Sequence, residues 1–256
     1  EEARAASDAR RKEIRGIYRD FSRINTLGDR HGYDVMLEFT VNPDLVREMF
    51  ATLRSDLHRA FWYFFEEPAA FETAALFHHS DTAGGWKKRR SDLHGLLPVL
   101  TDDAKYALQG ELAEHFKQSE SRGESCEIIQ ESRADGRHYW FASLADTWQT
   151  VENVDEEGRH DLLMIRPTFE VVFVYNPRDY TLAIRGLRSR KHITAMQQAF
   201  GRTQLKRDLP EDKMEDVYDL NRLVEPLMAS EDEFPFTTNV NDHIRSVRVK
   251  SIRYKV

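Results

Sequence analysis

The sequence predicts an α+β protein, in which a mainly helical N-terminal part precedes an antiparallel β-meander of about six strands. Three observations predict this class. Apolar residues recur at helical spacing in the first part of the chain. Three pairs of apolar runs, each pair joined by a turn signal, follow residue 123. A further amphipathic segment near 191–205 predicts a helix that packs on the sheet. Residues 1–122 are therefore expected to form a mainly helical part and residues 123–256 a β-rich part. No Gly/Ser-rich or Pro-rich linker separates the two parts, so they can form one continuous domain.

The N-terminal part is expected to hold three helices. The first reaches about Ile24, because an apolar stripe follows helical spacing at Ile14, Ile17, Tyr18, Phe21 and Ile24. Residues 33–41 are expected as a short strand. Residues 42–67 predict one long helix that Asn42 caps and Pro68 ends. Its expected core face holds Leu45, Met49, Phe50, Leu53, Leu57, Phe61 and Phe64. Residues 69–81 fit neither pattern clearly, residues 82–91 are expected as a loop, and another helix follows Thr101.

The β-rich part is expected to consist of three consecutive hairpins. Their turns lie at Asp135-Gly136, around Gly158 and around Pro177. The strand at 169–175 is apolar on both faces, which predicts a central position in the sheet. Residues 244–256 are expected to form a last strand.

The segment from residue 180 to 207 gathers seven Arg and Lys residues and no Asp or Glu, in a chain whose formal net charge is -7. Arg188, Arg190 and Lys191 fall where a strand ends and a helix begins. Exposed cations cost up to about 1 kcal/mol each at a helix N-terminus, so an anion such as phosphate is the expected guest. Arg185 would add to this site, and Gly186 would let the backbone approach the ligand. The alternative is that the acidic residues 208–219 neutralise the stretch within the fold.

Two further basic segments are expected to extend this site. The first places Trp86 directly before Lys87, Lys88, Arg89 and Arg90, a combination that single-stranded nucleic-acid-binding proteins use for stacking and phosphate contact. The second is the last strand, with Arg248 and Lys250. A solvated loop is the alternative reading of the first segment. Convergence of the three segments on one face cannot be read from the sequence.

Motifs for catalysis and cofactor binding are missing from the sequence. His78, His79 and Asp81 lie close together, but no HExxH, HxH or CxxC spacing occurs, so no metal and no cofactor are expected. No GxSxG, GxGxxG or GxxxxGK[ST] motif occurs either. Cys126 is the single cysteine and is expected to be a small buried residue. A reducing cytoplasm is the expected location, and no membrane partner is expected because no long apolar run occurs.

These observations predict a non-catalytic component that binds nucleic-acid phosphates within a larger prokaryotic assembly. The absence of the common catalytic motifs favours binding over catalysis. One alternative is a protein-protein assembly or adaptor subunit, such as one of a genome-defence system, whose amphipathic first helix docks a partner. Another is a hydrolase or nuclease with a dispersed site that uses His79 or Asp81.

Overall fold

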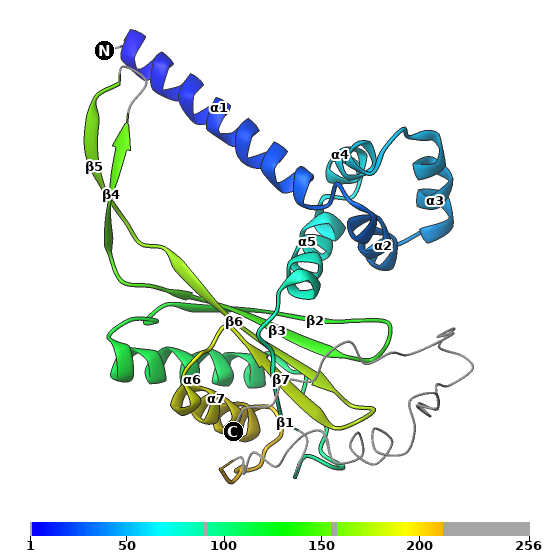
Figure 1. Cartoon of the computed structure of the whole chain (residues 1–256), viewed down its shortest axis with the longest axis vertical. Coiled ribbons are helices and arrows are strands. Elements are labelled where there is room, and N and C mark those ends of the chain that lie inside the picture. The colour runs from blue at the N-terminus through cyan, green and yellow to red at the C-terminus, as the bar shows by residue number, and fades with distance from the viewer. Residues whose placement is uncertain (1, 90–91, 155–157, 212–256) are drawn as a thin grey trace, which may run out of the picture. The chain divides into compact units, whose positions relative to one another are not determined.

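The protein has the predicted α+β fold (Figure 1). The computed structural model describes residues 2–89, 92–154 and 158–211. Its helices are α1 (Glu2–Thr26), α2 (Arg30–Phe39), α3 (Pro43–Thr52), α4 (Asp56–Glu66), α5 (Pro68–Thr82), α6 (Asp102–Glu120) and α7 (Arg190–Thr203). Its strands are β1 (Lys87–Arg89), β2 (Cys126–Ser132), β3 (His138–Ala145), β4 (Gln149–Val154), β5 (His160–Ile165), β6 (Thr168–Asn176) and β7 (Thr181–Arg185). The expected last strand at 244–256, with Arg248 and Lys250, lies outside the described residues, as does Arg90.

Five strands form one antiparallel sheet in the order β1-β7-β6-β3-β2. β6 lies in its centre, as its apolar sequence predicts. Val171 and Phe173 enter the core on one face, whereas Val172 and Val174 enter the core on the other. Alternate residues of a strand point to opposite faces, so a strand covered on both sides is apolar throughout.

Helices cover both faces of this sheet (Figure 1). On one face α6 and α7 pack so that Phe200 meets Trp140 at a centroid distance of 4.9 Å and Phe173 at 5.6 Å. On the other face α5 inserts Phe77 between Tyr139, at 4.8 Å, and Phe141, at 5.4 Å. The N-terminal helices and the sheet therefore share one core through α5. None of the helices in the described part of the chain is long and apolar enough to cross a membrane.

Two expectations for the N-terminal helices are wrong. Residues 33–41 were expected as a strand, but 30–39 form α2, because Asp29 accepts a hydrogen bond from the Gly32 N–H at 2.7 Å and caps the helix. The single helix expected over 42–67 is divided into α3 and α4, because the backbone leaves helical geometry at Leu53 and Ser55 caps a new helix. The break changes the buried face: Leu45, Met49, Leu57 and Phe61 are exposed, and Val46, Phe50, Ala60 and Tyr63 are buried.

The three predicted hairpins exist, but they do not form one meander. β4 and β5 pair only with each other, as a two-stranded unit that we call the β4–β5 ribbon. β6 returns to pair with β3, so the ribbon extends from the sheet between them (Figure 1). The expected loop at 82–91 also contributes β1, which pairs with β7. Strand pairing joins segments that are distant in the sequence. The alternation of apolar and polar residues within a strand therefore does not predict which strand it pairs with.

Candidate functional site

The pairing of β1 with β7 brings two of the predicted basic segments together. Lys87 lies opposite Ile184, and Lys88 lies opposite Ala183. At the end of the pair, the Arg185 guanidinium lies over the Trp86 ring, 5.6 Å from its centroid. We call this region, from Trp86 to Lys88 and from Arg185 to Lys191, the β1 edge. It unites segments that are almost a hundred residues apart in the sequence.

Lys87 and Lys88 serve different faces of the sheet. Residues directly opposite each other in an antiparallel pair point to the same face. Lys87 therefore shares the face of Ile184, which α6 and α7 cover, whereas Lys88 shares the face of Ala183, which packs toward α5. Both lysines are exposed and form no ion pair with a described residue. The β1 edge thus offers a cation to each side of the sheet.

Arg89 does not belong to the exposed site. Its side chain is 1% exposed and donates hydrogen bonds to Asp92 at 3.0 Å, to Gln197 at 3.3 Å and to the Pro210 carbonyl at 3.0 Å. These bonds tie β1 to α7 and to the segment after it. The expectation that Arg89 contacts an external anion is corrected accordingly, because its guanidinium is already surrounded by acceptors.

The start of α7 has the geometry that the basic sequence predicts. Arg188, Arg190 and Lys191 are exposed and make no ion pair with a described residue. Ser189 occupies the N-cap, yet its side chain makes no capping hydrogen bond, and the first turn holds no acid. The N–H groups of this turn therefore lack a side-chain acceptor among the described residues, which favours an external anion.

Arg185 and Gly186 have roles within the fold. The Arg185 side chain is largely buried and forms an ion pair with Glu170 of the neighbouring strand. Gly186 has a φ of 93°, and a Cβ at this position would overlap the Glu170 carbonyl oxygen. The glycine is therefore required by close packing against β6, and not by the approach of a ligand as expected.

A polar cavity of about 320 Å³ lies beside the β1 edge, where the end of α5 faces the sheet. Lys88 and Arg137 supply its cations, and Trp86 and Tyr139 supply aromatic rings. Ser80 also lines it, is 1% exposed, and its hydroxyl has no hydrogen-bond partner among the described residues. The remaining lining residues are Asp81, Val174, Asn176, Asp179, Thr181 and Ala183. The lining thus combines two cations, two carboxylates, two aromatic rings and one unpaired hydroxyl, which suits a polar ligand that carries a flat ring.

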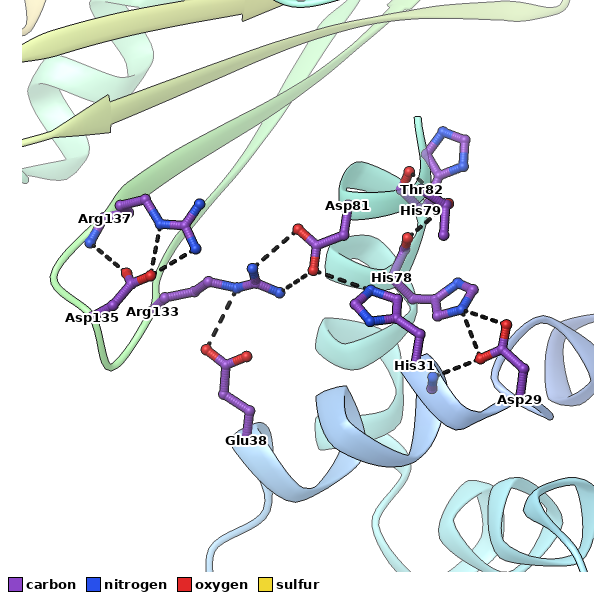
Figure 2. Close-up of polar contacts among 11 residues, drawn as sticks. Asp29, His31, Glu38, His78, His79, Asp81, Thr82, Arg133, Asp135 and Arg137 are labelled. Atoms are coloured by element: carbon purple, nitrogen blue, oxygen red, sulfur yellow. Dashed lines mark hydrogen bonds and ion pairs between the residues drawn. The ribbon is translucent and has the colours of Figure 1, made fainter. Parts of the chain in front are cut away.

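Asp81, which lines this cavity, belongs to a charge network that joins α2, α5 and the turn between β2 and β3 (Figure 2). Arg133, at the turn between β2 and β3, donates two hydrogen bonds to Asp81 of α5, at 3.0 and 2.6 Å. The same guanidinium lies 3.4 Å from Glu38 of α2, and His31 Nε2 lies 3.2 Å from Asp81. Burial raises the pKa of the Glu38 carboxyl, and the charge of Arg133 acts in the opposite direction. The network fixes α2 and α5 to the sheet and therefore fixes the cavity wall.

The histidine and aspartate pattern at 78–81 does not form a single site. His78 turns toward Asp29, at 3.2 Å, whereas Asp81 is held by Arg133 (Figure 2). His79 is 64% exposed and lies 3.7 Å from Glu170. In the described ranges, no group of three His, Cys, Asp or Glu side chains is arranged to hold a metal ion. His79 and Asp81, the residues proposed for a hydrolase, thus contact different partners.

The chain matches no family model, no curated protein and no solved structure. The function of the β1 edge is therefore inferred from its geometry and chemistry.

A histidine pair beside the β1 edge is expected to make the free energy of unfolding depend on pH. His115 of α6 and His192 of α7 share a hydrogen bond at 2.9 Å. Burial lowers the pKa of His115, and the neighbouring charges of His192 and Lys191 lower it further. The unfolded chain, with an ordinary pKa near 6.5, therefore binds more protons than the folded protein as the pH falls below about 6.5.

We expect the free energy of unfolding to decrease as the pH falls below about 6.5. His115→Gln is expected to flatten the decrease in urea titrations from pH 7.5 to 5.5, and an unchanged pH slope would show that His115 is not responsible.

Proposed function

We propose that the protein is a non-catalytic component that binds single-stranded nucleic acid at the β1 edge. The observation that supports this proposal is the pairing of β1 with β7, which brings Trp86 to Arg185, three residues before Arg188 in the sequence. Phosphates would follow the edge of the sheet from Lys88 on one face to Lys87 on the other, and then to Arg188, Arg190 and Lys191. The aromatic ring and the cavity beside them would accept a base.

The acidic net charge does not oppose this function, because the local field near a surface governs association more than the total charge does. The first turn of α7 supplies N–H groups and a positive dipole end in addition to the three side chains. Lys88 and Arg137 bring two cations to the neighbouring cavity. A competing explanation is that Lys87 and Lys88 keep the edge strand from pairing with other chains, since exposed edges commonly carry lysine. Binding measurements separate the two.

The test is binding of labelled single-stranded DNA, RNA and duplex DNA over a salt series. One variant carries Arg188→Glu, Arg190→Glu and Lys191→Glu, and a second carries Lys87→Glu and Lys88→Glu. Each variant is expected to lose at least about tenfold in affinity. The magnitude of the slope of log K against log salt should fall by about 2 for the triple variant, because each phosphate contact on a single strand contributes about 0.7 to that slope.

The matched control changes the same number of exposed cations elsewhere, with Arg47→Glu, Arg54→Glu and Lys117→Glu. It equals the triple variant in net charge and should retain more of the affinity. Equal losses in the two triple variants would mean that only the total charge matters, and no binding at low salt would exclude the proposal. Tighter binding of duplex DNA than of single strands would contradict base stacking on the Trp86 ring, because stacking needs an unpaired base. Cleavage of the labelled strands by the purified protein would instead favour the hydrolase alternative.

A further inference from the structure

The β4–β5 ribbon exposes apolar side chains on both of its faces. Its register places Val151, Leu163 and Ile165 on one face, and Val154, Leu162 and Met164 on the other. All six are exposed, and Leu162 and Met164 reach 68% and 70%. A two-stranded ribbon without further cover is at best marginally stable in water. The ribbon is therefore expected to be covered by another surface.

The first helix carries a second apolar surface without a cover. Phe21 lies near Phe61 of α4, with 6.0 Å between the ring centroids, and Ile24 is buried, so the end of α1 packs on the other helices. Before that point the stripe at Ile14, Ile17 and Tyr18 is exposed by 42%, 50% and 73%. A contiguous exposed stripe of this kind is typical of an interaction surface.

The two surfaces have opposite charges. Among the described side chains of α1 between residues 10 and 23, Arg10, Arg15, Arg19 and Arg23 outnumber Glu13 and Asp20. Among the described residues of the ribbon segment, Glu152 and Asp161 outnumber Arg159. Each surface combines apolar side chains with an excess of one sign, so each can cover the other and neutralise it. Within one copy neither surface is covered, because both sets of apolar side chains remain exposed.

We propose that the occupant of each surface is a second copy of this chain, with α1 of one copy seated on the β4–β5 ribbon of the other. Both complementary surfaces belong to the same chain, so a two-fold axis makes the contact twice and closes the assembly as a dimer. The apolar side chains supply the free energy and the opposite charges fix the pairing of helix with ribbon. This inference does not depend on nucleic-acid binding at the β1 edge.

Sedimentation equilibrium of the purified full chain tests the dimer. Ile17→Asp, on α1, and Leu162→Lys, on the ribbon, each place a charge of the opposing surface's own sign in the proposed contact twice. Either change is expected to raise the dimer dissociation constant by about 100-fold or more. Both side chains are exposed in one copy, so circular dichroism melting should show a folded protein in each case. Leu97→Asp is the matched control, because Leu97 is 63% exposed and lies outside both surfaces.

Cysteine pairing then tests which surfaces meet. The single native thiol, Cys126, is buried, and its pKa is raised to about 12 by that burial, so it does not compete in the reaction. A size-tagged Ile17→Cys chain is mixed with an untagged Leu162→Cys chain under mild oxidation. A disulfide between the tagged and untagged chains, absent when Leu97→Cys replaces either partner, would support the proposal. A monomer at the highest attainable concentration, or a dimer that neither Ile17→Asp nor Leu162→Lys weakens, would overturn it.

Discussion

Replacing Arg133 with methionine is expected to lower the free energy of unfolding by about 2 to 4 kcal/mol. The Arg133 side chain is 7% exposed and contacts the carboxylates of Asp81 and Glu38. Its guanidinium also lies over the Phe77 ring, 4.7 Å from the centroid. Methionine keeps the apolar stem of the side chain but leaves two partly buried carboxylates without their cation. The expected cost is below that of a fully buried pair, because Asp81 and Glu38 remain 22% and 28% exposed.

Urea unfolding of the single and double variants identifies the cause. Asp81→Asn, combined with Arg133→Met, should cost less than the sum of the two single changes, because the second change removes the charge that the first leaves unpaired. Arg137→Met is the matched control. Arg137 pairs with Asp135 two residues away and is 37% exposed, so a loss of at most about 1 kcal/mol is expected. Additive losses for Arg133 and Asp81 would contradict the interpretation of the network as one unit.

Replacing Phe77 with alanine is expected to have the largest effect, about 3 to 5 kcal/mol. The ring is fully buried and contacts Tyr139 and Phe141 of the sheet, and it stacks on Phe39 of α2 at 4.5 Å. Alanine would leave a cavity between the N-terminal helices and the sheet. We therefore expect a loss of stability together with a smaller denaturant dependence, since helices that detach early no longer unfold with the sheet.

The measurement is urea unfolding followed by two probes, tryptophan fluorescence and far-ultraviolet circular dichroism. The two transitions should coincide in the native protein and separate in Phe77→Ala. Phe65→Ala is the control, because Phe65 is 62% exposed and an exposed ring contributes little. Coincident transitions in Phe77→Ala would show that other contacts suffice to couple the helices to the sheet.

Local sequence signals predict those elements whose ends are fixed by neighbouring residues. Thr101 accepts a hydrogen bond from the Ala104 N–H, so the start of α6 can be read directly from the sequence. Met196 and Phe200 are buried at helical spacing, and α7 is predicted within two residues at each end. α2 is missed because its apolar residues also fit a strand, and its Asp29 cap lies in a segment that resembles a loop.

The site depends on contacts that no local pattern contains. The basic segments at 86–90 and 185–191 are each visible in the sequence, but their juxtaposition arises from β1–β7 pairing. Arg133, Asp81 and Glu38 come from three separate elements, and the sequence around each is ordinary. The burial of Arg89 is likewise invisible, since a run of adjacent cations predicts a solvated loop. Only the tertiary structure shows which of these adjacent cations are exposed and can contact a ligand.

The position of the β4–β5 ribbon affects how this fold can change in evolution. β3 and β6 are already paired from His138–Tyr175 to Ala145–Thr168, and the Asp146 N–H donates to the Pro167 carbonyl at 2.7 Å just beyond. The ribbon is thus an insertion into a hairpin that is complete without it. Lengthening such an insertion costs little, because loop-closure entropy grows only slowly with length. Changes in the length or sequence of the ribbon are therefore expected to leave the pairing of β3 with β6, and with it the sheet and the β1 edge, intact.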